Sequence, residues 1–336
     1  MLTNDELLER LNSAFKAITV GDLSEGILVP EQLDRFVQSM QHRTVILQEA
    51  RFIRMNSRQV NIDRTGFADW ILRSGKDGDG AYRTLPDGER VKPIFATNKL
   101  VAEELQAITG MKDQALRRNI ERGNFENSLI EMFGEAAGRD MEAWFILADK
   151  SLVWGEDPVI NVLRLTDGWA KLAVQKIYGG VGGSFNPEAD TWPENMFEAL
   201  LAALPKQYLL DESEWRLYVD WETRNDYREL LKKRQTALGD AATTTASELF
   251  YKGIPVRYVP MLSRSVAVEE GGSGKLAMLQ HPDNMVWGIF HEVTIERDRI
   301  AKARQTDFVL TMEGDAGYED ENAAVVAYID QDTIGS

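Results

Sequence analysis

The chain has 336 residues, of which 43% are hydrophobic, 27% charged and 9% aromatic, enough apolar material for a core and too much for a mostly disordered chain. Its 54 acidic residues outnumber its 38 Lys and Arg, and the resulting net charge of −16 argues against tight binding to nucleic-acid phosphates. The absence of cysteine excludes disulfides, thiolate zinc sites, iron–sulfur clusters and thiol nucleophiles.

The length suits one elaborated domain or two to three lobes. No stretch approaches the roughly 20 apolar residues of a membrane span. The N-terminus, MLTNDELLERLNSAFKAI, carries charges throughout and lacks the apolar core of a signal peptide. We therefore expect a soluble chain, made inside the cell, with no membrane partner.

The N-terminal part of the chain predicts two helices. Apolar residues at helical spacing predict an amphipathic helix over 3–18, which the segment from Gly21 to Gly26 ends. A second helix is predicted to begin at Pro30 and to continue through Phe52.

Residues 56–102 predict a long hairpin with a charged tip. Arms around 58–62 and 91–95 flank the polar stretch GKDGDGAYRTLPDGE at 75–89, which contains three turn signals. A two-stranded ribbon buries little and is marginal by itself, and a long excursion is usually functional or disordered. We expect this one to lie on another subunit.

A candidate strand at 99–103 and a short helix at 113–120 precede a long helix predicted over 124–148. At 1.5 Å per residue this helix would span about 40 Å, so we expect it to cross the face of a sheet. Its apolar residues fall on one broad stripe. The core candidates on that stripe are Phe125, Leu129, Phe133, Met141, Trp144 and Phe145.

A region of different make-up follows and predicts a mixed α/β lobe. Helices are expected at 167–178, 193–204 and 224–238, with strands at 215–221 and 254–260. From Gly288 the chain returns to strands, at 289–296, 308–313 and 323–329, which match a sheet under the long helix. No internal repeat at a fixed period is visible.

A search for catalytic and cofactor motifs yields nothing complete. The three histidines, His42, His281 and His291, are isolated in the sequence, so structural or surface roles are expected. The stretch EEGGSGKLA at 269–277 lacks both the first glycine and the Ser/Thr of a phosphate-binding loop. The run GGVGG misses the dinucleotide fingerprint because Phe185 stands at the third glycine position and no strand clearly precedes the run.

Acidic clusters are similarly uninformative. Asp220 with Glu222, or the group Asp315, Glu319, Asp320 and Glu321, offers carboxylates for acid–base or calcium chemistry, but no ligand spacing is met and solvated charge is expected. Asp77 and Asp79 begin an EF-hand-like pattern that Ala81 and Tyr82 break. The sequence therefore predicts no catalytic, metal-binding or cofactor-binding residue, no cofactor, and no enzymatic activity.

The order of segments is more informative. The start GILVPEQLDRFVQ, the hairpin, the run KPIFATNKLVAEELQAITG, the long helix, the segment ELFYKGIPVRYVPML and the closing strands follow one another over nearly the whole chain. This set resembles the major capsid proteins of tailed bacteriophages, the Hong Kong 97 fold. The resemblance implies an α+β fold with an N-terminal arm, an extended loop, a long spine helix, a peripheral domain and an axial domain.

The resemblance also implies domain boundaries. They are an N-terminal arm at 1–25, a helix leading to the loop at 26–55, the extended loop at 56–96, the peripheral domain at 97–158 with the spine helix at 124–148, the axial domain at 159–287, and a return to the peripheral domain at 288–331.

By this resemblance the chain self-assembles as hexamers and pentamers into an icosahedral head that encloses double-stranded DNA without binding it specifically. Localisation in the virion, after assembly in the host bacterial cytoplasm, is implied, with a separate scaffolding protein, a portal and decoration proteins as possible partners. Acidic character suits an inner wall that repels DNA. An encapsulin-type nanocompartment shell and a metal-assisted hydrolase using Asp220 and Glu222 are the alternatives.

The site residues follow from the same resemblance. Contacts between subunits are expected at the tip of the extended loop, and a glycine loop is expected near the five- and six-fold centres. The loop-tip residues are Lys76, Asp77, Asp79, Tyr82 and Arg83, and the axial-loop residues are Gly179, Gly180, Gly182 and Gly183.

Overall fold

The computed structural model describes residues 44–66, 71–84, 86–90, 94–112, 125–180, 182–233, 248–263, 267–268, 272–273, 275–290, 294–300 and 302–329. The helices predicted at 3–18 and 113–120, most of the helix predicted from Pro30, and His42 and His291 lie outside these residues.

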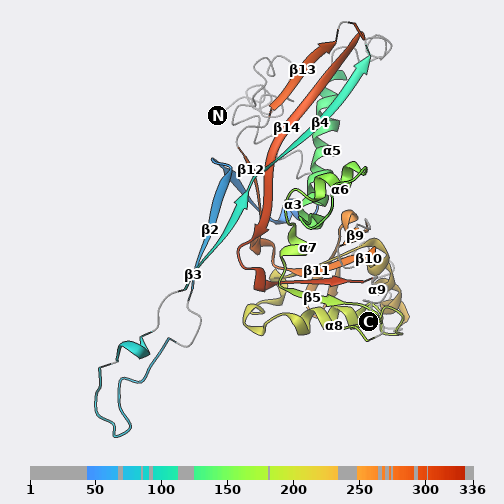
Figure 1. The fold of residues 1–336 in the computed structure, drawn as a ribbon. Coiled ribbons are helices and arrows are strands. Elements are labelled where there is room, and N and C mark those ends of the chain that lie inside the picture. Colours follow the sequence, from blue (N-terminus) through green and yellow to red (C-terminus); the bar gives the residue numbers. More distant parts are fainter. Residues whose placement is uncertain are drawn as a thin grey trace, which may run out of the picture.

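Two β-sheets and one long helix organise the described chain (Figure 1). In the five-stranded sheet, β14 (Gln305–Tyr318) pairs along one edge with β4 (Glu103–Lys112). Its other edge pairs with β12 (Met285–Phe290) and then with β13 (Thr294–Ile300), both antiparallel. The strand β1 (Arg51–Met55) adds to β12 in parallel. The 14-residue β14 is therefore the central strand of an elongated arm.

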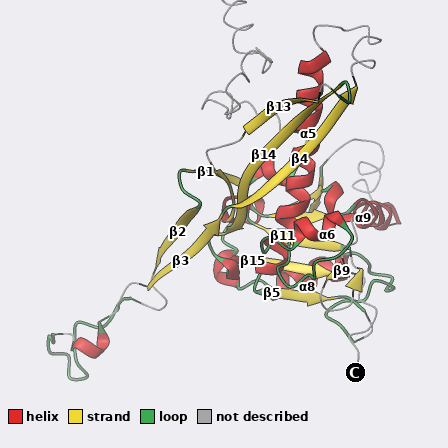
Figure 2. Ribbon diagram, turned by 45° about the horizontal axis from the view of Figure 1, so that its top comes forward, coloured by secondary structure: helices red, strands yellow, loops and turns green. Residues whose placement is uncertain are grey.

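The helix α5 (Phe125–Leu147) runs beside this arm in both ribbon views (Figures 1 and 2). A Cβ added to Gly314 of β14 would lie 3.5 Å from Met141 and 3.6 Å from Phe145, so the helix and the strand are in close contact there. The ring of Phe145 lies 6.1 Å from that of Trp287 on β12, and 5.9 Å from that of Trp169. Met141, Trp144 and Phe145 are buried, on the face that the helical spacing indicates.

The six-stranded sheet has the order β5 (Gln175–Tyr178), β15 (Ala324–Tyr328), β11 (Leu276–Gln280), β6 (Arg216–Val219), β8 (Ile254–Tyr258) and β7 (Leu249–Tyr251). Every residue of its central strands β11 and β15 is buried, as in a sheet covered on both faces. One face shares a core cluster with α5 and the five-stranded sheet. The opposite face packs on α8 (Glu194–Ala203) and α9 (Trp221–Lys233).

Short helices join these parts. The helices α6 (Pro158–Leu163) and α7 (Trp169–Leu172) follow α5, and α3 (Ile46–Glu49) precedes β1. Two ribbons, β2 (Gln59–Gly66) with β3 (Ile94–Val101), and β9 (Ala267–Val268) with β10 (Gly272–Ser273), complete the described α-helices and strands. Among the described residues, no helix is both long enough and apolar enough to cross a membrane.

Three secondary-structure predictions made from the sequence are wrong. The helix predicted through Phe52 gives way to β1, where Phe52 packs on Trp287 at a ring distance of 4.6 Å. The helix predicted at 167–178 is only α7, followed by β5, which pairs in parallel with β15. The closing strand β15 belongs to the six-stranded sheet, so the sheet beside α5 contains β12, β13 and β14 but not β15.

A buried carboxylate links α5 to α3. Glu142 is 2% exposed, and one of its carboxylate oxygens accepts the backbone N–H of Ile46 at 2.7 Å. Burial raises the pKa of Glu142 to about 7, although hydrogen bonds from the backbone of residues 45–47 favour the charged form. The carboxylate therefore takes the place of a side-chain cap at the start of α3.

This pKa predicts a pH dependence of subunit stability. A folded-state pKa above the ordinary 4.5 means that the folded state binds the proton more tightly than the unfolded state. The resulting stabilisation, about 3 kcal/mol, is complete below pH 4.5 and is lost as the pH rises through about 7. Glu142→Gln keeps an acceptor for Ile46 and removes the titration.

Urea unfolding of unassembled wild-type and Glu142→Gln subunits at several pH values between 4.5 and 8 checks this expectation. The stability of the wild type should fall relative to that of the variant as the pH rises. Curves that stay parallel over the whole range would show that Glu142 does not titrate with a raised pKa.

Candidate assembly site: the extended hairpin

The strands β2 and β3 form an antiparallel ribbon that leaves the body of the molecule and carries a long excursion (Figure 1). Their register pairs Gln59 with Val101 at the body and Gly66 with Ile94 at the far end. The strand β2 thus covers the first predicted arm. The second strand lies later in the sequence than the arm predicted at 91–95, because β3 runs from Ile94 to Val101. Residues 71–84 and 86–90, beyond the ribbon, are termed the distal hairpin.

The distal hairpin is organised by its own turn chemistry. One carboxylate oxygen of Asp77 accepts the backbone N–H groups of Asp79 and Ala81, at 3.1 and 2.8 Å, as expected of an aspartate at a turn. Lys76 forms an isolated antiparallel bridge with Tyr82, and its ammonium lies 5.4 Å from the centre of the Tyr82 ring. The predicted turn at Asp79-Gly80 is present, with Gly80 at a φ of 84°.

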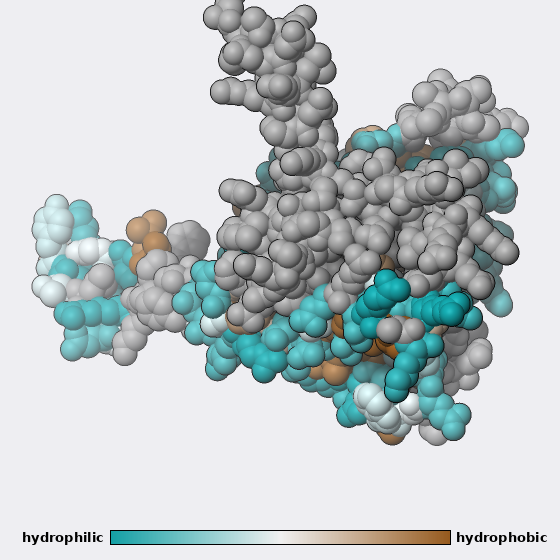
Figure 3. All heavy atoms as spheres, turned by 90° about the horizontal axis from the view of Figure 1, so that it is seen from above, coloured by the Kyte–Doolittle hydropathy of each residue, from teal (hydrophilic) through white to brown (hydrophobic). Residues whose placement is uncertain are grey.

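An ion pair closes the base of this turn. The guanidinium of Arg83 donates to both carboxylate oxygens of Glu89, at 2.9 and 2.6 Å. This bidentate contact raises the pKa of Arg83 and lowers the pKa of Glu89. The distal hairpin therefore has a defined shape although it stands clear of the body. Its surface is mostly hydrophilic and is interrupted by a hydrophobic patch (Figure 3).

Apolar side chains on the distal hairpin are left in solvent. Tyr82 is 89% exposed and Leu72 is 72% exposed, and Ile71 is also exposed. A tyrosine and two large aliphatic side chains gathered on a projecting element are the composition of an interaction surface. Of the predicted loop-tip residues, Lys76, Asp77, Asp79 and Tyr82 lie together on one turn, with Arg83 beside it. Their contact with a second subunit remains a prediction.

The root of the ribbon is fixed to the body by a small apolar cluster. Ile62 of β2 and Leu100 of β3 are buried against Met55, Ala102 and Val286. The chain bends between β3 and β4 at Ala102, whose N–H donates to the carbonyl oxygen of Arg58 at 2.8 Å. The strand predicted at 99–103 is thus two strands that meet at this bend, with β3 in the ribbon and β4 in the five-stranded sheet.

Asp315 of β14 holds this bend. Its carboxylate accepts the N–H of Val101 at 2.7 Å, the hydroxyl of Thr166 at 2.6 Å and its neighbour's N–H, that of Ala316, at 2.9 Å. Burial raises the pKa of Asp315 although these three donors favour the charged form. The expectation of solvated charge for this residue is wrong, because the local sequence does not reveal the donors on Val101 and Thr166, which are 214 and 149 positions away.

Asp320 links the ribbon to the six-stranded sheet's lobe. It accepts the Tyr208 hydroxyl at 2.7 Å and the N–H of Asn322 at 3.1 Å, and it pairs with Arg64 of β2. Burial opposes ionisation of Asp320, but these contacts outweigh it and lower the pKa. Nearby, the Asn98 amide donates to the carbonyl oxygen of Tyr318 at 2.8 Å. The direction in which the ribbon leaves the body is therefore set by partly buried polar contacts.

Replacing Asp315 tests this role. Asp315→Asn keeps the shape but cannot accept hydrogen bonds at both positions, so it leaves a buried donor unsatisfied. We expect a loss of about 1–3 kcal/mol and faster hydrogen exchange at Val101. Asp63→Asn, on the same ribbon, is the matched control, because the carboxylate of Asp63 accepts the hydroxyl of Thr97 in an exposed contact, and its replacement should change stability little. Equal effects of the two substitutions would contradict the assignment.

The predicted glycine loop lies elsewhere, at the end of β5. The N–H of Gly179 donates to the carbonyl oxygen of Tyr328 at 2.8 Å, and that of Gly180 to Phe185 at 3.0 Å. Gly180 and Gly182 have φ values of 121° and 87°, a region in which a side chain is strained, while a Cβ at Gly183 would lie 2.5 Å from the carbonyl oxygen of Tyr178. A strand does precede the loop, contrary to the sequence interpretation. Whether the loop lies at a symmetry axis remains a prediction.

The spine-helix candidates divide into two groups. Met141, Trp144 and Phe145 lie in the main core cluster. The side chains of Phe125, Leu129 and Phe133, in the first part of α5, lie outside the described residues. The described part of α5 and the distal hairpin lie on opposite sides of the body in Figures 1 and 2, so Met141, Trp144 and Phe145 do not contact the distal hairpin.

The carboxylates considered for hydrolysis have structural contacts. Asp220 is buried and its carboxylate accepts the N–H groups of Glu222 and Thr223, both at 3.2 Å, at the start of α9. Glu222 pairs with Lys275. His281 caps a short turn by accepting the N–H of Asp283 at 3.3 Å. No group of three or more potential metal ligands occurs among the described residues.

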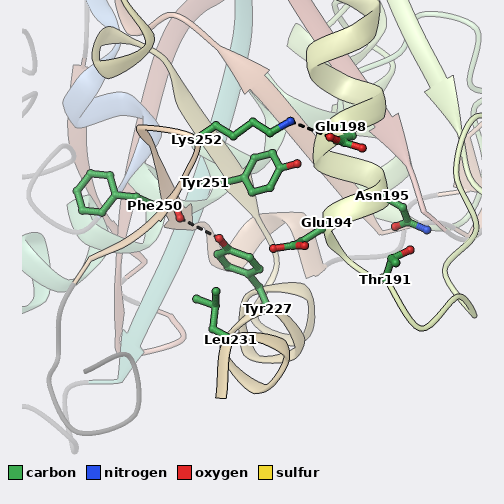
Figure 4. A pocket seen from close by; sticks show the side chains of 9 residues that line it. All are labelled: Thr191, Glu194, Asn195, Glu198, Tyr227, Leu231, Phe250, Tyr251 and Lys252. Atoms are coloured by element: carbon green, nitrogen blue, oxygen red, sulfur yellow. Dashed lines mark hydrogen bonds and ion pairs between the residues drawn. The ribbon is translucent and has the colours of Figure 1, made fainter. Parts of the chain in front are cut away.

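A cavity of 510 Å³ lies in the six-stranded sheet's lobe, between α8, α9 and β7 (Figure 4). Two of its lining side chains donate to partners in the cavity wall: Lys252 to Glu198 at 2.7 Å, and the hydroxyl of Tyr227 to the backbone carbonyl oxygen of Phe250 at 2.8 Å. The contact with Glu198 raises the pKa of Lys252, and burial raises that of Tyr251. Asp220 and Glu222 are not among its lining residues, so the cavity does not join them into an acid–base pair.

Comparison with solved structures identifies the fold of the chain. The chain superposes on a chain of the satellite phage P4 procapsid with a TM-score of 0.63, at 13% sequence identity, covering 97% of this chain and 98% of the other. A chain from the capsid of a native GTA particle gives 0.55 at 14% identity, covering 87% and 91%. The chain has the Hong Kong 97-type capsid fold.

The capsid fold expected from the order of segments is thereby confirmed. A structure of Mycobacterium phage Cain also matches, over 100% of both chains, with a TM-score of 0.53 and 14% identity. No family model matches the sequence. Among curated proteins, the chain is 26% identical over 324 residues to the putative prophage capsid protein YqbE of Bacillus subtilis (strain 168), covering 96% of this chain and 97% of that protein. The predicted resemblance to phage capsid proteins is therefore confirmed too.

Proposed function

We propose that this chain is the major capsid protein of a tailed bacteriophage and builds the icosahedral head around double-stranded DNA. Its capsid fold and its similarity to a prophage capsid protein along almost the whole chain support a structural role in a virion. The observation that carries the proposal is the distal hairpin, a shaped element with exposed Tyr82 and Leu72 that the subunit itself leaves in solvent.

Assembly into a shell is physically reasonable for such a chain. When each copy makes many weak contacts, a wrongly placed copy can dissociate, while the complete lattice is stabilised by the number of contacts. Hexamers and pentamers of this chain would supply those contacts. A scaffolding protein, a portal and decoration proteins are further proposed partners. We also propose that the shell assembles in the host cytoplasm and that the chain has no enzymatic activity.

The net charge of −16 supports a further part of the proposal, an inner wall that does not bind DNA specifically. The two alternatives have no comparable support. The matching proteins named above are phage or particle capsids, and the carboxylates of the hydrolase alternative cap a helix or pair with a lysine.

Expression and purification of the chain, followed by electron microscopy and sedimentation, test the proposal. We expect closed particles with hexameric and pentameric units in electron micrographs, and a sedimentation profile that changes from subunits to shells with increasing concentration. A chain that stays monomeric at high concentration, with residues 71–90 protected from hydrogen exchange by its own body, would contradict it.

A further inference from the structure

A row of three positive charges follows one side of α9. Arg224, Arg228 and Lys232 are spaced four residues apart, so their side chains are neighbours on the helix surface. We term these three residues the α9 stripe. At a rise of 1.5 Å per residue, the charges follow one another in steps of about 6 Å and span about 12 Å. In a chain with a net charge of −16, the α9 stripe is a local concentration of positive charge.

The acidic residues of α9 do not neutralise the stripe. Glu222 pairs with Lys275, and the carboxylate of Asp226 accepts the indole N–H of Trp192 at 2.9 Å. Glu229 follows Asp226 by three residues and so lies on the same side of the helix as Asp226. Among the described residues, no ion pair or hydrogen bond involves the side chains of the α9 stripe, and the Nε atoms of its two arginines are buried without a partner.

Positive charges accumulate at the start of the stripe. Like charges at four-residue spacing on a helix repel each other, and Arg224 and Arg228 are such a pair. Burial lowers the pKa of Arg224, and the charges of Arg228 and of Arg257 on β8 lower it further. Arg257 is itself paired, with Glu248 at 2.6 Å and with Glu49 at 3.4 Å, so these carboxylates already have a partner. Because a guanidinium stays charged in proteins, an anion bound at the stripe would relieve this repulsion.

The shape of the α9 stripe selects the kind of anion. A guanidinium presents a planar fork of N–H groups that matches the oxygens of a phosphate. A single small anion is held by groups that converge on one point, whereas the stripe is a row of charges along a helix. A DNA strand carries one phosphate for about every 3.4 Å of helix axis, so a row of about 12 Å lies opposite three or four phosphates. The row therefore fits a polyanion with regularly repeated charges.

The α9 stripe is remote from the proposed assembly site. In both ribbon views, α9 lies on the side of the six-stranded sheet's lobe that faces away from the distal hairpin (Figures 1 and 2). Substitutions in the stripe therefore leave the distal hairpin and the root of its ribbon in place.

We propose that the α9 stripe binds phosphate groups of the DNA that the shell encloses. This inference rests on the proposed shell function and adds one attractive surface to a wall that is otherwise acidic. Contacts to phosphates position a nucleic acid without reading its sequence, so the stripe is consistent with an interior that does not bind DNA specifically. It also requires that the stripe face the inside of the shell.

Binding of a short fluorescent DNA duplex of arbitrary sequence to unassembled subunits, measured by anisotropy at several salt concentrations, tests the proposal. We expect binding that weakens with salt and is similar for any sequence. Arg224→Gln with Arg228→Gln should reduce the slope of log affinity against log salt concentration by about 1.8, or about 0.9 for each lost phosphate contact. The same slope in the double variant as in the wild type would overturn the proposal.

Lys232→Gln and Lys233→Gln form a matched pair for the same measurement. Both substitutions remove one exposed lysine from the last turn of α9, but adjacent residues on a helix do not share a side. Lys232→Gln should reduce the slope by about 0.9, and Lys233→Gln should leave it nearly unchanged. Equal effects of the two substitutions would show that only the total charge matters and would overturn the stripe as a site.

Competition identifies the source of the anion. Inorganic phosphate, at the same concentration of phosphate groups as the duplex, should displace little of the bound duplex. Efficient displacement would show a site for a single phosphate ion and would overturn the assignment to DNA. Polyglutamate should also compete weakly; binding of polyglutamate as tightly as of the duplex would show that an acidic protein segment is the occupant and would overturn the proposal as well.

Acetylation of lysines in assembled particles tests the position of the stripe in the shell. Lys232 should be acetylated more slowly in DNA-filled particles than in empty ones, with Lys233 as the internal reference, as measured by mass spectrometry. Equal rates for Lys232 in the two kinds of particle would overturn the proposal.

The outcomes separate this inference from the proposed function. The double arginine variant should keep the melting temperature of the unassembled subunit, because it removes a repulsion and no contact, and it should still form particles. Particles whose α9 stripe does not bind DNA would overturn the inference and leave the shell function standing. A wild-type chain that forms no particles would overturn the shell function and, with it, the enclosed DNA as the occupant.

Discussion

Deletion of residues 75–89 is expected to abolish shell formation while leaving the subunit folded. The hydrogen bonds described for this segment stay within the distal hairpin, with Asp77 bonded to Ala81, Arg83 to Glu89, and Lys76 and Arg83 to the adjoining Ser74. Because the root of the ribbon is fixed independently, by Leu100 and Asp315, removal of the tip leaves the buried contacts of the root in place. The exposed Tyr82 is lost with the tip, and with it an anchor for a second copy.

Two measurements check this expectation on the same preparation. Thermal unfolding of the deletion variant should give a melting temperature close to that of unassembled wild type, and electron microscopy should show no closed particles at concentrations at which wild type is fully assembled. Normal particles from the deletion variant would show that the tip does not contribute to assembly.

Trp144→Ala is expected to have the largest effect on the subunit itself. Trp144 is 1% exposed and packs its ring 5.1 Å from that of Phe145, in the cluster shared by α5 and both sheets. Truncation of a buried large aromatic side chain costs about 3–5 kcal/mol through lost transfer energy and the cavity left behind. Since the indole N–H has no hydrogen-bond partner among the described residues, the loss is one of packing.

Urea unfolding of the unassembled subunit measures this effect. Trp144→Phe should lose less, because it keeps an aromatic ring and removes an unsatisfied donor. Trp154→Ala is the matched control for the loss of a tryptophan, since its side chain is mostly in solvent. An unchanged midpoint for Trp144→Ala would contradict the burial of this residue.

The agreement between sequence and structure is best where a pattern is local and long. The stripe predicted over 124–148 corresponds to α5, Phe125–Leu147, because a 3.6-residue period sustained over so many residues matches a helix and does not match the two-residue period of a strand. The helices predicted at 193–204 and 224–238 correspond similarly to α8 and α9, although the end of the latter lies outside the described residues. The turn at Asp79-Gly80 depends on only a few neighbouring residues and is likewise found.

The errors occur where pairing with a distant strand overrides a local preference. Residues 51–55 continue an apolar pattern typical of a helix, yet they form β1 because β12, far later in the chain, offers a parallel register from Arg51–Val286 to Met55–Phe290. Residues 175–178 become β5 for the same reason, through β15. In short segments with mixed patterns, the local interactions stabilise a helix too weakly to determine the secondary structure, so pairing with a distant strand determines it.

The sequence by itself determined the spine helix, the turns of the distal hairpin and, through the order of its segments, the resemblance to phage capsid proteins. Only the tertiary structure decided that β15 completes the six-stranded sheet, that Asp315 and Asp320 fix the direction of the ribbon, and that Glu142 is buried. Val101 and Asp315 are 214 positions apart. The burial of a carboxylate and the donors that stabilise it depend on such distant residues, and no pattern within a local window contains them.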